Sequence, residues 1–248
     1  MLNTKARRLI MRQITVPNSE KPGLNKDGKK RLVVIVTYFL LLTIILFFAA
    51  GTWQWPAAWV YTLLSFAALL IAGIWMVRHH PGIINERGRK AEGTKPFDKL
   101  FTKLYLPLPF LLPLVAGLDY RFDWTAIPLA WQIVGVIGLV PGLILPYWAM
   151  AVNDYLATTV RIQIERGHQV CTTGPYRYVR HPMYVGSILT SVGAPLLLGS
   201  WWALLVGLWA TGLFVWRTAR EDRTLQAELP GYSDYAQDVR YRLLPGVW

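Results

Sequence analysis

Most of the residues that could do chemistry lie in two short segments near the C-terminus. The first runs from Gln163 to Tyr184 and reads Gln-Ile-Glu-Arg-Gly-His-Gln-Val-Cys-Thr-Thr-Gly-Pro-Tyr-Arg-Tyr-Val-Arg-His-Pro-Met-Tyr. Gly167 and the Gly174-Pro175 pair indicate a loop, and Pro182 suits the first position of a helix. His181 is therefore predicted at a helix N-terminus, where free backbone N–H groups and the positive end of the helix dipole favour an anion.

Each of these side chains has an ordinary explanation when it is taken singly. The tyrosines could be aromatic residues of a membrane interface, and Arg177 and Arg180 could anchor the chain to lipid headgroups. Together, however, a glycine-bounded loop delivers polar and aromatic side chains to the start of a helix. That arrangement is suitable for binding a small charged cofactor.

The second segment begins at Arg217 and reads Arg-Thr-Ala-Arg-Glu-Asp-Arg. Arg217 and Glu221 are four residues apart, so on a helix they share one face. The simplest interpretation is a surface ion pair, which contributes about 0.3–0.5 kcal/mol. An arginine that precedes its glutamate is the weaker order for such a pair, which favours a functional role slightly.

Metal chemistry finds little support in the sequence. Cys171 is the single cysteine, which excludes a disulfide framework and a multi-cysteine metal site. His79 and His80 are adjacent, whereas two ligands on one helix face need a spacing of three or four residues. We therefore predict no metal site. The segment around Glu86 and Arg87 is interpreted as a basic loop on anionic headgroups, or as a brace for a site.

The composition indicates an integral membrane protein. Hydrophobic residues make up 54% of the 248 residues and charged residues 16%, against about 25% charged in soluble domains. Stretches free of charged residues predict about six transmembrane helices, the last two forming a hairpin around Gly199-Ser-Trp-Trp202. Their ranges are 32–50, 57–77, 104–118 and 127–152, then 182–200 and 201–216. The third contains Pro107, Pro109 and Pro113, so it is predicted to be kinked or tilted.

The distribution of positive charge predicts the topology. Of 26 Lys and Arg residues, all except Arg121 lie in segments on one side of the predicted membrane. By the positive-inside rule that side is the cytoplasm, and both termini lie there, as in a multi-pass protein of the plasma or inner membrane. The net charge of +12 thus indicates topology and attraction to membrane lipids, not nucleic acid. The predicted spans hold no ionisable residue, which argues against proton-coupled transporters and pumps.

The chain divides into three predicted regions. Residues 1–31 form a basic cytoplasmic segment, residues 32–152 a four-helix transmembrane region, and residues 153–248 a cofactor-binding region with the final hairpin. The predicted fold is all-α and polytopic, with a cytoplasmic cofactor site.

Residues 150–248 resemble the isoprenylcysteine carboxyl methyltransferase family and its phospholipid methyltransferase relatives. The resemblance rests on these motifs: His168-Gln-Val-Cys171, Gly174-Pro-Tyr176, Arg180-His-Pro-Met-Tyr184, Arg217 with Glu221, Leu229-Pro-Gly-Tyr232 and Tyr241-Arg-Leu-Leu-Pro245. Sterol reductases end in a similar pattern and bind a nicotinamide cofactor there. Asp222 stands where the family often has a second glutamate.

The resemblance implies an enzyme that binds S-adenosylmethionine. It assigns these residues to the cofactor: Gln163, His168, Gln169, Val170, Cys171, Tyr176, His181, Pro182, Met183, Tyr184 and Glu221. It assigns Arg217 to the methyl acceptor, as substrate-binding and catalytic residue. The physical chemistry agrees, because a sulfonium already activates its methyl group and its transfer needs positioning and exclusion of water rather than a metal.

The expected activity is therefore methylation of a lipophilic or lipidated acceptor, most simply the carboxylate of an isoprenylcysteine-like substrate. Two other enzymes remain as alternatives, a phospholipid N-methyltransferase and a sterol-type NADPH reductase. A membrane scaffold or transporter is the non-enzymatic alternative.

Overall fold

A computed structural model describes residues 23–89 and 93–248 of the chain. Most of the predicted basic segment 1–31 therefore lies outside the described residues. The described parts contain helices and loops but no strand, so the all-α prediction is confirmed. The helices are α2 (Lys26–Ala50), α3 (Pro56–His79), α4 (Pro81–Gly88), α5 (Pro96–Tyr105), α6 (Leu108–Phe122), α7 (Leu129–Val152), α8 (Pro182–Leu198), α9 (Trp201–Glu228) and α10 (Tyr232–Asp238).

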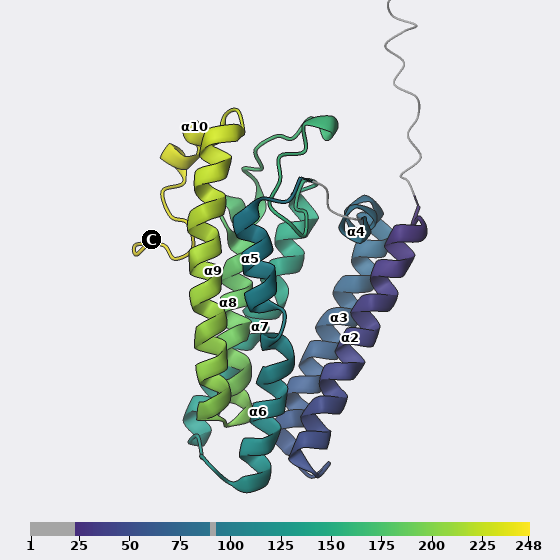
Figure 1. The fold of residues 1–248 in the computed structure, drawn as a ribbon, viewed down its shortest axis with the longest axis vertical. Helices are drawn as coiled ribbons and strands as arrows, with labels where there is room; N and C mark the ends of the chain where they lie inside the picture. The colour runs from purple at the N-terminus through teal and green to yellow at the C-terminus, as the bar shows by residue number, and fades with distance from the viewer. Residues whose placement is uncertain (1–22, 90–92) are drawn as a thin grey trace, which may run out of the picture.

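The long helices form a membrane bundle (Figure 1). Among the described residues, five helical segments are long and apolar enough to cross a bilayer, the 27-residue segment Pro96–Phe122 being one of them. The 17-residue helix α8 is apolar but shorter, and it forms with α9 the hairpin that the sequence predicts. The protein is thus a polytopic integral membrane protein.

The third predicted span is broken, as its prolines indicate. The segment divides into α5 and α6 around Leu106 and Pro107, where proline removes one backbone donor from the helical ladder. The helical segment begins at Pro96 rather than near residue 104. The first turn of α5 therefore contains the charged residue Asp98. We expected the helix to begin after this residue.

Helices α7 and α8 pack closely because glycines face one another across their contact. A Cβ added at Gly193 would lie 2.7 Å from the backbone nitrogen of Leu139, and one at Gly142 would lie 2.8 Å from that of Thr190. Small residues allow such close backbone approach in membrane bundles. This contact places the start of α8, which carries the predicted site, against the end of α7.

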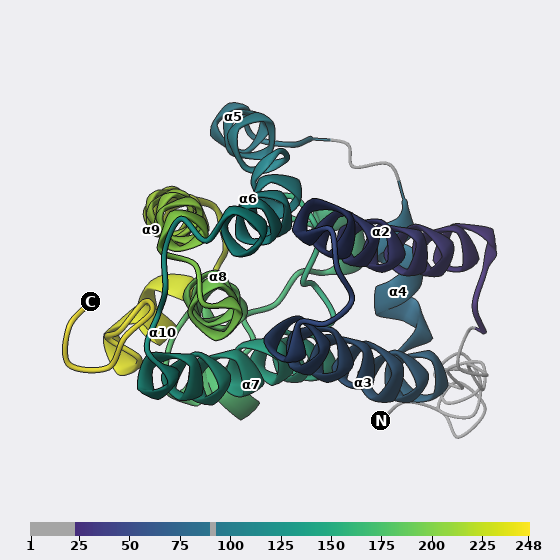
Figure 2. The same cartoon turned by 90° about the horizontal axis from the view of Figure 1, so that it is seen from below.

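At the other side of the bundle, α2 and α3 diverge from the remaining helices, and α4 lies between them (Figures 1 and 2). Asn85 of α4 is bound to the start of α2: its Oδ1 accepts from the Asn25 N–H at 3.0 Å, and its Nδ2 donates to the Gly23 carbonyl at 3.1 Å. The start of α2, helix α4 and helix α10 lie at one end of the bundle (Figure 1).

Helix α9 extends beyond the predicted transmembrane span 201–216. The last span was expected to end near Trp216, yet α9 continues without a break to Glu228, because the stretch from Arg217 to Glu228 contains neither proline nor glycine. The chain then turns at Pro230-Gly231, where Gly231 has a φ of +81°, and α10 packs back against the bundle. The residues after Trp216 therefore stand on a rigid helix beyond the predicted span.

Candidate active site

A cavity at the α10 end of the bundle gathers ten of the twelve predicted site residues. It lies between the loop that joins α7 to α8, the first turn of α8 and the extension of α9, and holds about 740 Å³ of space including its open side. The predicted residues that line it are His168, Gln169, Val170, Cys171, Tyr176, His181, Met183, Tyr184, Arg217 and Glu221. Gln163 and Pro182 do not line it.

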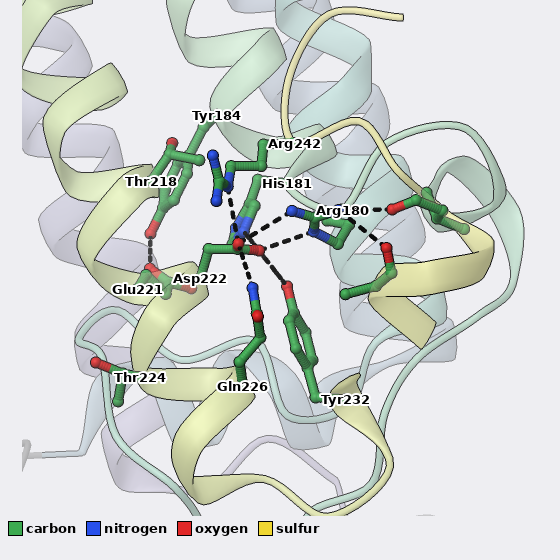
Figure 3. Close-up of polar contacts among 12 residues, drawn as sticks. Arg180, His181, Tyr184, Thr218, Glu221, Asp222, Thr224, Gln226, Tyr232 and Arg242 are labelled. Carbon is green, nitrogen blue, oxygen red and sulfur yellow. Dashed lines mark hydrogen bonds and ion pairs between the residues drawn. The ribbon is translucent and has the colours of Figure 1, made fainter. Parts of the chain in front are cut away.

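Glu221 and Tyr184 meet at this cavity. The Tyr184 hydroxyl donates a hydrogen bond to Glu221 Oε2, as Figure 3 shows. Tyr184 lies one turn into α8, while Glu221 comes from α9, so the hairpin brings the two predicted cofactor residues together. Arg217 Nε lies 3.9 Å from Glu221 Oε2, which is the i, i+4 proximity that the spacing predicts.

Arg217 has a second acidic neighbour that the sequence did not indicate. Its guanidinium lies 2.9 Å from Asp98 Oδ1, donates to the Thr158 carbonyl at 3.2 Å, and stands 4.4 Å from the ring centroid of Phe101. The Asp98 carboxylate is completely buried and also accepts from the Val160 N–H at 2.8 Å. Arg217 is therefore neutralised within the protein and fixed between α5, α9 and the loop.

Asp222 is the centre of a buried polar network (Figure 3). Its carboxylate accepts from Arg180 at 2.8 and 3.0 Å, from Arg242 at 2.8 Å and from Tyr232 at 3.0 Å. His181 Nε2 lies 3.2 Å away, and the Asp222 side chain is 0% exposed. A buried carboxylate is stable only when it is paired and fully hydrogen-bonded. Asp222 thus connects the start of α8 to α9 and the C-terminal segment.

The start of α8 has the predicted backbone. Pro182 occupies the first turn, and His181 precedes it with φ −127° and ψ 60°. The backbone N–H groups of Arg180 and His181 donate to the carbonyls of Tyr241 and Arg242 at 2.9 and 3.0 Å. The C-terminal residues Tyr241 and Arg242 therefore occupy these two donors. Fewer backbone N–H groups are free to bind an anion at this helix start than we expected.

Tyr176 is held on the wall of the cavity by two polar contacts. Its hydroxyl accepts from Asn153 Nδ2 at 3.0 Å, and its carbonyl accepts from the Tyr235 hydroxyl at 2.7 Å. Burial raises the pKa of both tyrosines above the usual value. Both therefore remain neutral at physiological pH and offer aromatic faces to the cavity.

His168 and Gln163 have different places in the loop. His168 lines the cavity, its ring stacks on Tyr155 with centroids 4.7 Å apart, and its Nδ1 accepts from the Gln163 N–H at 3.3 Å. Burial, together with the cations of Arg166 and Arg161, lowers the pKa of His168. His168 is thus uncharged at neutral pH.

Gln163 is buried beneath the loop. Its side chain donates to the Tyr155 carbonyl at 2.5 Å and accepts from Arg166 at 2.6 Å, so it shapes the loop away from the cavity. Pro182 is likewise buried and starts α8. The geometry assigns both residues to support of the site rather than to contact with a ligand.

Helix α4 braces the loop, as the second of our two interpretations proposed. Glu86 pairs with Arg161 at 2.6 Å, and Arg161 lines the cavity. Arg87 donates to the carbonyls of Leu156 and Ala157 at 3.1 and 3.3 Å, and these two residues also line the cavity. The front half of the chain thus takes part in building the site.

Sequence reasoning missed several cavity residues. Asn153, Tyr155, Leu156, Arg161, Tyr232 and Tyr235 all line the cavity. One signal could have found the Asp222 network: Arg180 and His181 at a predicted helix start need a buried counter-charge, and Asp222 is adjacent to Glu221. The tyrosines of α10 gave no such signal, because interface aromatics have the same composition.

Comparison with known proteins finds a matching family and a similar enzyme. The phospholipid methyltransferase family matches residues 131–229, from α7 to the residue after α9. A protein-S-isoprenylcysteine O-methyltransferase of Dictyostelium discoideum is 26% identical over 187 residues, which cover 70% of this chain and 71% of that protein.

The chain is a membrane methyltransferase. The resemblance to isoprenylcysteine carboxyl methyltransferases and their phospholipid methyltransferase relatives is confirmed. The matched range 131–229 contains all twelve predicted site residues, and ten of them, including Arg217 and Glu221, line the cavity. Helices α2 to α6 lie outside this range.

Proposed function

We propose that this methyltransferase uses S-adenosylmethionine and methylates the carboxylate of an isoprenylcysteine-like lipophilic acceptor. One observation supports the proposal above all: a single cavity combines the acidic Glu221 and the faces of Tyr176 and Tyr184 with the guanidinium of Arg217. A cationic donor and an anionic acceptor could bind there side by side. The name of the Dictyostelium relative supports the same acceptor class.

The cavity residues fit the cofactor. S-adenosylmethionine, when bound, supplies a sulfonium whose methyl group is already activated for transfer. Glu221 supplies negative charge, and an aromatic ring such as that of Tyr176 can stabilise a cation. The ring of Tyr184 already lies against Arg217 and His181. His168 also lines the cavity and is uncharged, because its pKa is lowered, so it adds no positive charge there. His168, Gln169, Val170, Cys171 and Met183 complete the wall.

Arg217 is proposed to orient the acceptor carboxylate. A carboxylic acid is ionised at neutral pH, so no residue has to remove a proton before methyl transfer. A guanidinium holds a carboxylate by charge-assisted, two-pronged hydrogen bonds. Asp98 and Thr158 fix the Arg217 guanidinium, and such orientation contributes several kcal/mol, about 7–11 in the best intramolecular cases.

Exclusion of water is the remaining requirement, and the loop 153–181 supplies it. Arg87 and Glu86 attach this loop to α4, and the Asp222 network attaches the start of α8 to the C-terminal segment. The cavity therefore lies beneath a braced cover. Competing hydrolysis is suppressed when water is kept from the reacting groups.

A phospholipid N-methyltransferase is the second candidate, because the matching family carries that name. An amine acceptor would have to lose a proton first, and a guanidinium beside it would be a poor neighbour. The guanidinium of Arg217 can donate hydrogen bonds to a carboxylate but not to a protonated amine, so we favour the anionic acceptor. Neither comparison supports the sterol-type reductase or the scaffold.

Methyl transfer in proteoliposomes tests the proposal. The full chain would receive S-adenosylmethionine with a radioactive methyl group, and either N-acetyl-S-farnesylcysteine or phosphatidylethanolamine as acceptor. We expect label in the farnesylcysteine product, released by mild base because the product is a methyl ester. If the label is found in the phospholipid, resists mild base and is absent from farnesylcysteine, the enzyme is an N-methyltransferase and the proposed function is wrong.

We also propose that the site faces the cytoplasm. Basic residues gather at the end of the bundle that holds α4, α10 and the cavity, and the positive-inside rule places that end in the cytoplasm.

A further inference from the structure

A second and larger cavity lies beside the candidate active site, between α2, α3, α7 and α8. It holds about 1970 Å³ of space including its open side, and its lining is mostly apolar. Its walls run from Arg31 to Leu40 on α2 and from Phe66 to Arg78 on α3, which is ~14–18 Å at 1.5 Å per residue and about half of a ~30 Å hydrocarbon layer. We call it the apolar cavity.

Two half-buried arginines lie at the α4 end of the apolar cavity, and a third, exposed Arg78, lines it at the end of α3. Arg31 comes from α2 and Arg87 from α4, and both line the space. The helices that carry them cross closely, since a Cβ at Gly88 would lie 3.3 Å from the Arg31 Cβ. The polar end of the apolar cavity thus holds two positive charges side by side.

Neither charge is neutralised within the described part of the chain. Arg31 and Arg87 take part in none of the ion pairs found there, and Arg31 Nε is buried without a hydrogen-bond partner among those residues. Burial, followed by the cations of Arg31 and Arg217, lowers the pKa of Arg87 to about 10. Arg87 is still charged at neutral pH, so the end of the cavity attracts an anion.

Arg87 also marks the junction of the two cavities. Its guanidinium donates to the carbonyls of Leu156 and Ala157, and Arg217 donates to the next carbonyl along the loop, that of Thr158. Because these three carbonyls are consecutive, the guanidiniums of Arg87 and Arg217 bind neighbouring positions of the loop. Asp98 and Glu221 compensate Arg217, whereas Arg87 forms no ion pair with any residue that the structure describes.

We propose that Arg87, supported by Arg31, binds the anionic group of the methyl acceptor, which is a lipid with one apolar chain and a carboxylate head. The chain lies in the apolar cavity and the carboxylate reaches the methyl donor between Arg87 and Arg217. This assignment rests on the proposed function and deepens it. A zwitterionic phospholipid fits less well, because its amine would meet two uncompensated cations before reaching the donor.

The first test changes the charge. In the full-length protein in detergent, Arg87→Gln should raise the KM for N-acetyl-S-farnesylcysteine about ten- to a hundredfold, the range expected for one lost charged hydrogen bond. The affinity for S-adenosylhomocysteine, measured by calorimetry, should stay within about threefold, which also shows that the variant is folded. Arg31→Gln, which leaves the loop carbonyls untouched, should raise KM in the same direction.

Arg78→Gln is the matched control, because exposed Arg78 lines the same cavity at the end of α3. It loses the same charge and should keep the KM of the unchanged protein. The carboxamide of the farnesylcysteine acceptor should compete poorly with the acid in the unchanged protein. The acid should keep a smaller advantage in Arg87→Gln, because Arg217 still favours it.

The second test fills the space. Nothing lies within 4 Å of a Cβ at Gly73, which lines the apolar cavity, so Gly73→Leu places a side chain there without a collision. It should raise KM for the farnesyl acceptor more than for a geranyl acceptor, with S-adenosylhomocysteine affinity unchanged. Gly212→Leu on α9, equally free of neighbours and exposed, is the control and should change neither.

The outcomes separate the two proposals. If the unchanged protein methylates farnesylcysteine while Arg87→Gln and Gly73→Leu keep its KM, the assignment of the apolar cavity is wrong and the proposed function stands. If the unchanged protein binds no S-adenosylhomocysteine, the proposed function itself fails. Unaltered competition by acid and carboxamide in Arg87→Gln would also contradict the role of its charge.

Discussion

At the scale of single residues, Arg217 and Glu221 show how one helix face serves two purposes. Their four-residue spacing allowed an ordinary surface ion pair, but both side chains line the cavity and Arg217 is only 8% exposed. Arg217 also compensates buried Asp98. The simple ion-pair interpretation treats the two residues as equivalent, whereas our proposal gives Glu221 to the cofactor and Arg217 to the acceptor.

This difference gives a prediction for two conservative variants. Glu221→Gln should weaken binding of S-adenosylhomocysteine by one to two decades, because a charged hydrogen bond is worth about 1.5–3 kcal/mol. Arg217→Lys keeps a cation beside Asp98 but loses the planar fork that grips a carboxylate. It should leave that affinity nearly unchanged and reduce methyl transfer about a hundredfold.

Calorimetry and turnover measured on the same preparations decide between the two roles. If both variants have equal and small effects in both assays, Arg217 and Glu221 form only a surface ion pair and the proposed roles are wrong.

His168 gives a prediction about pH. Its pKa is lowered in the folded protein by burial and by nearby arginines, whereas in the unfolded chain it is near 6.5. Below that value the unfolded state binds the extra proton more readily, so stability is lost as the pH falls through about 6.5. Protonation at Nδ1 would also remove the bond from the Gln163 N–H.

The thermal unfolding of detergent-solubilised protein at pH 7.5 and 5.5 measures this effect. His168→Gln should lose less stability over that interval than the unchanged protein. The same loss in both proteins would show that the titration of His168 is not involved.

The sequence predicted individual cavity residues better than it predicted their partners. His181, Tyr184 and Glu221 were found because their motif is local in the chain. The Asp222 network joins residues from 180 to 242, and a single sequence does not show which distant charges meet. Gln163 lies in the same region of the sequence as the cavity residues, but its side chain binds within the loop and does not line the cavity.

At the scale of the elements, the hairpin of α8 and α9 and the contact of α7 with α8 position the site. The hairpin was predictable, because Gly199 and the tryptophans after it separate two apolar stretches. The shared face of Arg217 and Glu221 predicted that this helix continues past the last span, but its end at Glu228 was not predicted. Propensity continues a helix through charged residues until a proline or glycine stops it.

The α7–α8 contact can be tested at one glycine with a control on its partner helix. Gly193→Ala brings a methyl group to 2.7 Å from the Leu139 backbone nitrogen, and overpacking of this kind costs about 1–3 kcal/mol. Gly138→Ala on α7 meets its nearest atom only at 3.9 Å. It should be neutral or slightly stabilising, because alanine favours a helix over glycine.

Thermal unfolding in detergent compares these two variants with the unchanged protein. A lower unfolding temperature in Gly193→Ala alone is the expected result. If both alanine variants melt like the unchanged protein, the close backbone contact does not exist.

At the scale of the whole molecule, Arg87 links two cavities: it lines the apolar cavity and donates to carbonyls of residues that line the candidate active site. The cavity under the loop combines acidic, aromatic and cationic groups. The apolar cavity lies between α2 and α3, which are outside the matched range 131–229, and α7 and α8, which are inside it. The sequence predicted apolar helices before residue 153. It did not predict that α2, α3 and α4 enclose a space, because hydropathy is the same for a residue that faces lipid and one that faces a cavity.

The topology of the molecule is a prediction at this scale. Reporter fusions after Trp248 and within the turn at Asp123, between α6 and α7, should lie on opposite sides of the membrane. The C-terminal reporter should be cytoplasmic, on the side of the basic residues. Reporters on the same side would mean that the α8–α9 hairpin or another segment does not cross the membrane as we propose.

The central claim is that the cavity between the α7–α8 loop, α8 and α9 binds S-adenosylmethionine. Calorimetric titration of the full-length protein in detergent with S-adenosylhomocysteine and, separately, with NADPH tests this claim most directly. The account predicts saturable binding of S-adenosylhomocysteine with one site per chain and no heat of binding with NADPH. Saturable binding of NADPH, with none of S-adenosylhomocysteine, would contradict it.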